Sequence, residues 1–162
     1  MARRLRPVGL DFIDDAPIRL VFATGTGAPP EAVYEALAEE VAGWPGWFKA
    51  VTLARPTHGG AGREVRLMGG VRFQETIMAA DPGQRYAYRV DTTNAPGVQA
   101  LVEEWRLTPA GSGTHVRWTF AADGSGPFRL GLTAARPGLG HSFRTAVRTL
   151  DARLTARRAA DQ

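Results

Sequence analysis

The chain has no cysteine, three histidines and no apolar run near the ~20 residues that a membrane-spanning helix needs. Without cysteine, disulfides, thiolate nucleophiles and Cys-ligated metal sites are excluded. The histidines His58, His115 and His141 lack the spacing of a zinc site, so we predict no metal. No glycine-rich phosphate loop follows a strand in the required order, and we expect no cofactor.

The composition predicts one domain that spans residues 1–162. With 44% apolar residues in 162, the chain is long enough to bury a core and still enclose a cavity. Residues 1–16 form an N-terminal arm that carries arginines and aspartates but no apolar segment of the kind found in signal peptides. We therefore expect a cytoplasmic protein with no membrane span.

The basic charge does not point to a nucleic acid. The net charge is +4 and the pI is about 10.3, but the arginines are spread along the chain at alternating strand positions. This pattern predicts the solvated outer face of a half-buried sheet, and we expect no nucleic-acid partner. The positions concerned are Arg66, Arg72, Arg89, Arg106 and Arg117.

Hydrophobic alternation predicts seven strands. Glycine, proline, asparagine and aspartate separate segments of strand length, and the short connections favour antiparallel hairpins. After the first strand, Pro29 and Pro30 start a short helix over 30–42, which Gly43 and Pro45 end or bend. The predicted strands are 18–23, 51–54, 63–68, 71–80, 84–92, 99–108 and 114–122.

The C-terminal part is predicted to contain a loop and a long helix. Glycine and proline are frequent in residues 123–140, so we interpret this segment as a loop with one helical turn around 128–132 that could act as a flap. From 141 to 159, apolar residues recur with the period of a helix. The expected fold is α+β, with a curved seven-stranded antiparallel sheet wrapped around this helix.

Three segments stand out in their order along the chain: Ala28-Pro29-Pro30-Glu31-Ala32-Val33-Tyr34, Trp44-Pro45-Gly46-Trp47-Phe48 and Gly113-Thr114-His115-Val116-Arg117-Trp118. They resemble segments of the START-like, birch-pollen-allergen-like superfamily (SRPBCC), in particular its polyketide cyclase/dehydrase-like branch. The resemblance implies a helix-grip fold with two short helices after the first strand. It also implies a deep cavity between sheet and long helix that holds lipids, polyketides or other apolar molecules.

Two glutamates interrupt the apolar inner face of the predicted sheet. A carboxyl group in an apolar cavity has a raised pKa, which suits a general acid or base, so Glu75 and Glu103 are candidate catalytic residues. Tyr88, with Tyr86, is a candidate donor to a carbonyl oxygen. The alternatives are that the glutamates lie at the cavity mouth or pair with arginine, and that the tyrosines only pack.

Apolar residues on the same inner face are candidates for ligand contact. Aromatic side chains there suit a wall for a flat ligand, although they could equally fill the core beneath the helix. The candidates are Trp47, Phe48, Phe73, Ile77, Tyr86, Trp105, Trp118, Phe120, Phe143 and Val147.

Three functions remain open from the sequence. The first is binding of a small apolar or aromatic ligand in the cavity. The second is a polyketide aromatase/cyclase or dehydratase activity that uses the cavity glutamates and tyrosines without metal or nucleotide. The third is a protein-interaction module that uses the basic outer face. A homodimer is a candidate assembly.

Overall fold

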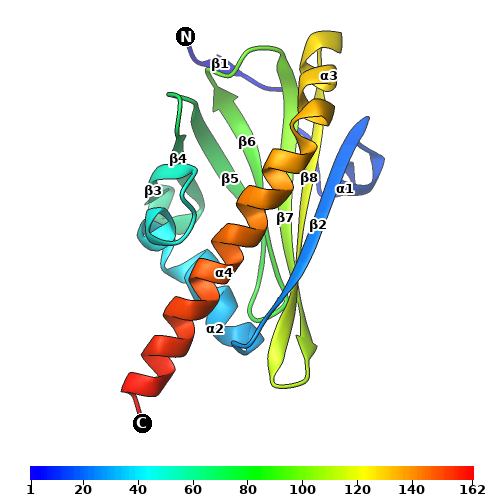
Figure 1. Cartoon of the computed structure of the whole chain (residues 1–162). Coiled ribbons are helices and arrows are strands. Elements are labelled where there is room, and N and C mark those ends of the chain that lie inside the picture. Colours follow the sequence, from blue (N-terminus) through cyan, green and yellow to red (C-terminus); the bar gives the residue numbers. More distant parts are fainter.

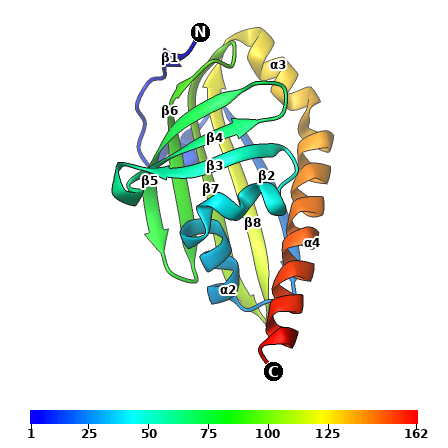
Figure 2. The same cartoon turned by 90° about the vertical axis from the view of Figure 1, so that its left-hand side faces the viewer.

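The computed structural model describes all residues from 1 to 162. A strongly curved antiparallel sheet has its seven main strands in the order β2-β8-β7-β6-β5-β4-β3, and helix α4 (Arg136–Ala160) lies across its concave side (Figures 1 and 2). The predicted α+β architecture is confirmed. The strands are β2 (Ile18–Thr26), β3 (Val51–Thr57), β4 (Gly62–Leu67), β5 (Arg72–Asp81), β6 (Arg85–Thr93), β7 (Val98–Ala110) and β8 (Gly113–Gly124).

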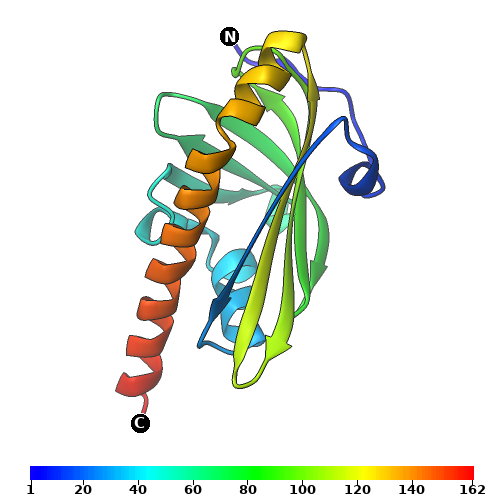
Figure 3. The same cartoon turned by 45° about the vertical axis from the view of Figure 1, so that its right-hand side comes forward.

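The N-terminal arm adds two small elements to the predicted set. The two-residue strand β1 (Arg3–Arg4) pairs with the end of β6 and becomes the eighth strand of the sheet. Helix α1 (Phe12–Asp15) packs on β7 and β8 from the side opposite to α4 (Figure 3). Its apolar residues form a separate small cluster on the outer face with Ala100, Val102 and Ala121.

The helical segment predicted over 30–42 is interrupted at Glu40, and a second short helix follows it, as the resemblance implied. Helix α2 (Pro30–Tyr34) continues as a π-helical turn, η1 (Glu35–Glu39), and then as a 3₁₀ helix, η2 (Val41–Gly46). The backbone of Glu40, at φ −98° and ψ 51°, leaves the helical region and separates the two turns. The indole of Trp44 donates to the carbonyl of Leu37 at 2.9 Å and stabilises this irregular path. Because of this break in the helix, the aromatic residues after Gly43 face the sheet.

The loop predicted over 123–140 is wrong, because most of this segment is helical. Helix α3 (Gly126–Ala134) begins after Ser125, whose hydroxyl accepts a hydrogen bond from the amide of Phe128 at 3.3 Å. Helix α4 begins at Arg136 rather than at 141. Both helices carry a proline within their first two positions, where no amide donor is needed, so these prolines start helices instead of breaking them.

Helix α4 closes the concave face with one apolar stripe. Its buried residues are Gly140, Phe143, Ala146, Val147, Leu150 and Leu154. The ring of Phe143 stacks on Trp118 of β8 at a centroid distance of 5.7 Å. None of the helices combines the length and the apolar character that a membrane crossing requires.

Candidate functional site

A cavity of about 200 Å³ lies between the sheet and the α3–α4 segment, with 12 hydrophobic residues among the 16 that line it. Strands β4 to β8, the residues between η2 and β3, and the start of α4 all contribute to its wall. Leu132, Leu139 and Ser142 line it on the helical side. The cavity therefore occupies the place that the resemblance implied.

Strand register brings a polar cluster to this apolar cavity. Arg63 of β4 lies directly opposite Glu75 of β5, and Tyr88 of β6 lies directly opposite Glu103 of β7. Directly paired side chains point to the same face of a sheet, about 4.5 to 5.5 Å apart at Cβ. Asp91 of β6 is the extra residue of a β-bulge between the Gln74–Thr92 and Glu75–Val90 pairs. All four side chains of the two pairs line the cavity.

Arg63 is held as a buried cation between two aromatic rings. Its guanidinium carbon lies 3.8 Å from the ring centroid of Tyr88 and 4.4 Å from that of Trp44. Its Nε and Nη2 both donate to Glu75 Oε2 at 3.3 Å. The side chain of Arg63 is 2% exposed, so the aromatic faces and one carboxylate replace water around the positive charge.

Glu103 is held by neutral donors instead. Its Oε1 accepts hydrogen bonds from the hydroxyl of Tyr88 at 3.0 Å and from the indole of Trp118 at 2.9 Å. The indole of Trp105 in turn donates to the Tyr88 oxygen at 3.2 Å. This chain of hydrogen bonds fixes the position of Glu103 without giving it a counter-ion of its own.

Burial raises the pKa of the ionisable groups in this cluster. Burial raises the pKa of Glu75 to about 7, with Arg63 opposing the shift and Glu103 adding to it. Burial also raises the pKa of Glu103, against Arg63 and the donors Tyr88 and Trp118. The pKa of Tyr88 lies well above its usual value because of burial and the adjacent Glu103. Near neutral pH, Glu75 can therefore exchange a proton.

Two buried polar atoms of the cluster have no hydrogen-bond partner. They are Nη1 of Arg63 and Oε1 of Glu75. Buried polar groups in folded proteins are nearly always paired, and an unpaired one costs about 1 to 3 kcal/mol. The inner ion pair thus retains one free donor and one free acceptor.

The cavity brings together seven of the residues predicted as site residues. They are Phe48, Phe73, Glu75, Tyr88, Glu103, Trp118 and Phe120. Tyr86 and Ile77 line a different recess of about 230 Å³ beside α2 and η1. Trp105, Phe143 and Val147 lie in the hydrophobic core and are not part of the cavity wall.

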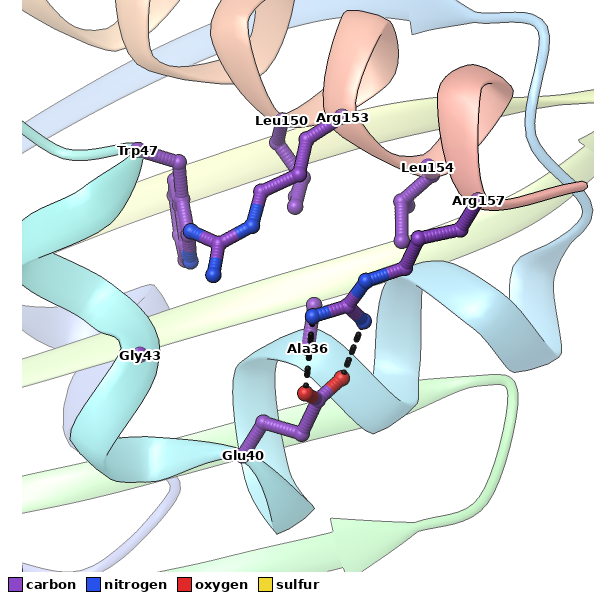
Figure 4. A pocket seen from close by; sticks show the side chains of 8 residues that line it. All are labelled: Ala36, Glu40, Gly43, Trp47, Leu150, Arg153, Leu154 and Arg157. Atoms are coloured by element: carbon purple, nitrogen blue, oxygen red, sulfur yellow. Dashed lines mark hydrogen bonds and ion pairs between the residues drawn. The ribbon is translucent and has the colours of Figure 1, made fainter. Parts of the chain in front are cut away.

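Trp47 belongs to the seam between η2 and the C-terminal half of α4, and does not line the cavity (Figure 4). In this seam Arg157 donates two hydrogen bonds to the carboxylate of Glu40, at 2.8 and 3.1 Å. The space left there is about 10 Å³, too little for a ligand. The seam fastens α4 to the irregular helical turns.

Arg63 is the main site residue that the sequence interpretation missed. A signal for it exists, because Arg63 alternates with Val65 and Leu67 and so interrupts an apolar strand face in the way that Glu75 does. Trp44 was missed as a cavity residue because its orientation depends on the break at Glu40. No group of three or more His, Cys, Asp or Glu side chains is placed to hold a metal ion.

Comparison with known proteins identifies the family. The family described as polyketide cyclase / dehydrase and lipid transport matches residues 25–155, and the chain belongs to it. An uncharacterized protein of Mycobacterium tuberculosis is 33% identical over 160 residues, which covers 96% of this chain and 95% of that protein. An uncharacterized protein of Mycobacterium bovis matches to the same extent.

Solved structures with the same fold are much more distant in sequence. A START superfamily protein from Mycobacterium smegmatis has a TM-score of 0.66 at 9% identity, covering 85% of this chain and 97% of that one. Major latex-like protein 151 from Panax ginseng has a TM-score of 0.64 at 13% identity, covering 84% and 96%. These likenesses establish the helix-grip fold, and the resemblance to the START-like superfamily is confirmed. The family and the fold are of a type that holds hydrophobic ligands.

Proposed function

We propose that the protein binds a small, mostly apolar ligand in the cavity between the sheet and α4. The observation that carries the proposal is the cavity itself, which has a volume of about 200 Å³. Three quarters of the residues that line it are hydrophobic. Apolar surface that is buried in such a site contributes about 25 cal/mol per Å². A well-formed apolar pocket with a few convergent polar groups is the usual form of a ligand site.

A cavity-filling variant tests this proposal. Val65→Phe places a larger apolar side chain in the wall, so we expect it to fold and to lose binding of toluene. Val21→Phe is the matched control, because Val21 is half-buried on edge strand β2 and does not line the cavity. Binding is measured from shifts of the Trp44 and Trp118 indole N–H signals by NMR. No shift in the wild-type protein at saturating toluene, or equal shifts in all three proteins, would contradict the proposal.

A second candidate function is acid–base catalysis on the bound ligand. It is supported by Glu75, whose pKa burial raises to about 7, in the same cavity as the Tyr88–Glu103 pair. Native mass spectrometry of freshly purified protein would identify a retained substrate class. Turnover of that substrate would then be expected to fall at least tenfold in Glu75→Gln, with loss of the pH–rate inflection near 7. An unchanged profile in both Glu75→Gln and Glu103→Gln contradicts the catalytic role.

The third candidate, protein interaction through a basic outer face, is not favoured by the contacts of that face. Arg66 and Arg106 are paired with Glu64 and Glu104, and Arg89 is paired with Asp91. These carboxylates reduce the positive potential that such an interface would need.

A further inference from the structure

The unpartnered atoms of the Arg63–Glu75 pair define what kind of polar group the cavity can receive. Arg63 Nη1 can only donate a hydrogen bond, and an ionised Glu75 Oε1 can only accept one. A group that satisfies both must accept and donate. A hydroxyl group does so, whereas a methyl group does neither and a carboxylate can only accept.

The charge of the cluster favours a neutral group. Arg63 is the only cation in the cavity wall, and it faces two carboxyl groups, those of Glu75 and Glu103. Once either carboxyl is ionised, the positive charge is already balanced. A ligand carboxylate would add a negative charge to a buried site with no cation left to compensate it, which costs several kcal/mol in a low-dielectric environment.

The volume of the cavity limits the rest of the ligand. Cavities of about 150 Å³ lined by apolar side chains bind benzene, and sites for drug-sized ligands are usually about 300 to 1,000 Å³. At about 200 Å³, this cavity accommodates a single ring with a short substituent. Two fused rings or a long acyl chain would require displacement of the wall.

We infer that the ligand is a neutral hydroxyl compound about the size of one substituted benzene ring. This inference rests on the proposed function. Its ring packs among the apolar side chains, and its hydroxyl accepts a hydrogen bond from Arg63 Nη1 and donates one to Glu75 Oε1. The pair acts as the selective element in an otherwise apolar cavity, because an analogue without the hydroxyl leaves both atoms unpaired.

Three probes of similar size test the inference: benzyl alcohol, its isostere ethylbenzene, and the anion benzoate. Titrations at pH 8 are followed by the indole N–H signals of Trp44 and Trp118. In the wild-type protein we expect benzyl alcohol to bind about tenfold more tightly than ethylbenzene, as one net hydrogen bond to a charged group provides. Benzoate should bind at least about tenfold more weakly than benzyl alcohol.

The double variant Arg63→Met/Glu75→Met removes both partners and leaves no unpaired ion at the pair. In this double variant we expect the order of affinities to reverse, with ethylbenzene binding about tenfold more tightly than benzyl alcohol. The reason is that a buried hydroxyl group then has no hydrogen-bond partner at this position. The matched control is Arg55→Met/Glu64→Met, which removes a directly opposed Arg–Glu pair on the outer face and should keep the wild-type order. The fold of each variant is checked by circular dichroism. If the double variant does not fold, Glu75→Met alone is the substitute; it removes the acceptor but keeps the Arg63 donor, so it should reduce the preference for benzyl alcohol over ethylbenzene without reversing it.

The outcomes separate the inference from the function on which it rests. If ethylbenzene binds more tightly than benzyl alcohol to the wild-type protein, or if the order is the same in the inner-pair variant, the inference fails while ligand binding stands. Tighter binding of benzoate also overturns it, in favour of an anion site. If none of the probes shifts the cavity indoles, the proposed function itself fails.

Discussion

The two faces of the sheet carry glutamates that expose similarly small fractions to water but differ in desolvation and in partners. Glu64 on the outer face is 5% exposed and Glu75 on the inner face is 4% exposed. Hydrogen bonds from Arg55 and Arg66 hold the pKa of Glu64 below its usual value despite burial, whereas burial raises the pKa of Glu75 to about 7. The exposed fraction of the carboxylate therefore does not decide its charge state.

The depth of burial and the partners decide it together: desolvation outweighs Arg63 at Glu75, whereas hydrogen bonds from Arg55 and Arg66 outweigh desolvation at Glu64. Arg55 keeps 59% of its side chain in water while it pairs with Glu64, so little of its hydration is lost. The side chain of Arg63 is only 2% exposed to water, and its guanidinium group lies on the inner face. Adjacent residues of β7 repeat the contrast, because Glu104 pairs with two arginines and Glu103 accepts hydrogen bonds from neutral donors. The inner face thus keeps a carboxyl that can titrate in an apolar cavity.

Removal of the inner cation, Arg63, should have the largest effect on stability. Arg63→Met leaves Glu75 and Glu103 buried without a positive charge, and we expect a loss of about 3 to 5 kcal/mol in the free energy of unfolding at pH 8. At pH 5 the loss should be smaller, because Glu75, whose pKa is raised to about 7, then holds a proton. Urea denaturation at the two pH values measures it.

The outer-face control for this prediction is Arg55→Met. Glu64 retains Arg66 at 2.9 Å and contact with water, so we expect a loss below about 1 kcal/mol at both pH values. Equal losses for the two arginine variants would show that the inner cation has no special role. Recovery of stability in the Arg63→Met/Glu75→Met variant would locate the cost in the unpaired carboxylate.

The pH dependence of stability should distinguish the inner Glu75 from the outer Glu64. Glu75 has a pKa of about 7 in the folded protein against 4.5 for a free side chain, so between these values the folded state holds a proton that the unfolded state has lost. The stability contributed by Glu75 therefore falls as pH rises from about 4.5 to 7, by about 3 kcal/mol in total. In Glu75→Gln this fall should disappear, leaving the fall due to Glu103, whose pKa is also raised. Denaturation from pH 4 to 8 measures it.

Several charged or titratable groups act on Glu75 and enter this prediction: Arg63, Glu103, Tyr86, Tyr88 and Asp91. Glu64→Gln is the control with the opposite sign. The pKa of Glu64 is lowered, so its contribution is present above the free-carboxyl pKa and is lost as pH falls through the folded value. A wild-type stability that rises between pH 5 and 7, and rises less in Glu75→Gln, would refute the assignment.

The sequence predicted the sheet well because alternation and turn residues report strands directly. It also placed Glu75 and Glu103 on the inner strand face, since each interrupts an apolar pattern, but left open whether they lie inside the cavity, at its mouth or paired with arginine. The helical segments were harder. Proline and glycine in residues 123–140 suggested a loop, but the prolines lie at helix starts. The packing of α4 decides which inner residues line the cavity and which fill the core. No local sequence pattern encodes this packing.

The smallest effect is expected where both partners of an ion pair are in water, as for Arg157 and Glu40. Arg157→Met should lower Tm by less than about 2 °C, and by less still in 1 M salt, where the screening length is about 3 Å. Arg148→Met is the control, because Arg148 is exposed on the same helix without an ion pair. A Tm loss as large as that of Arg63→Met would contradict the rule drawn from the two faces, that the cost of removing an arginine depends on how deeply the carboxylate it leaves unpaired is buried.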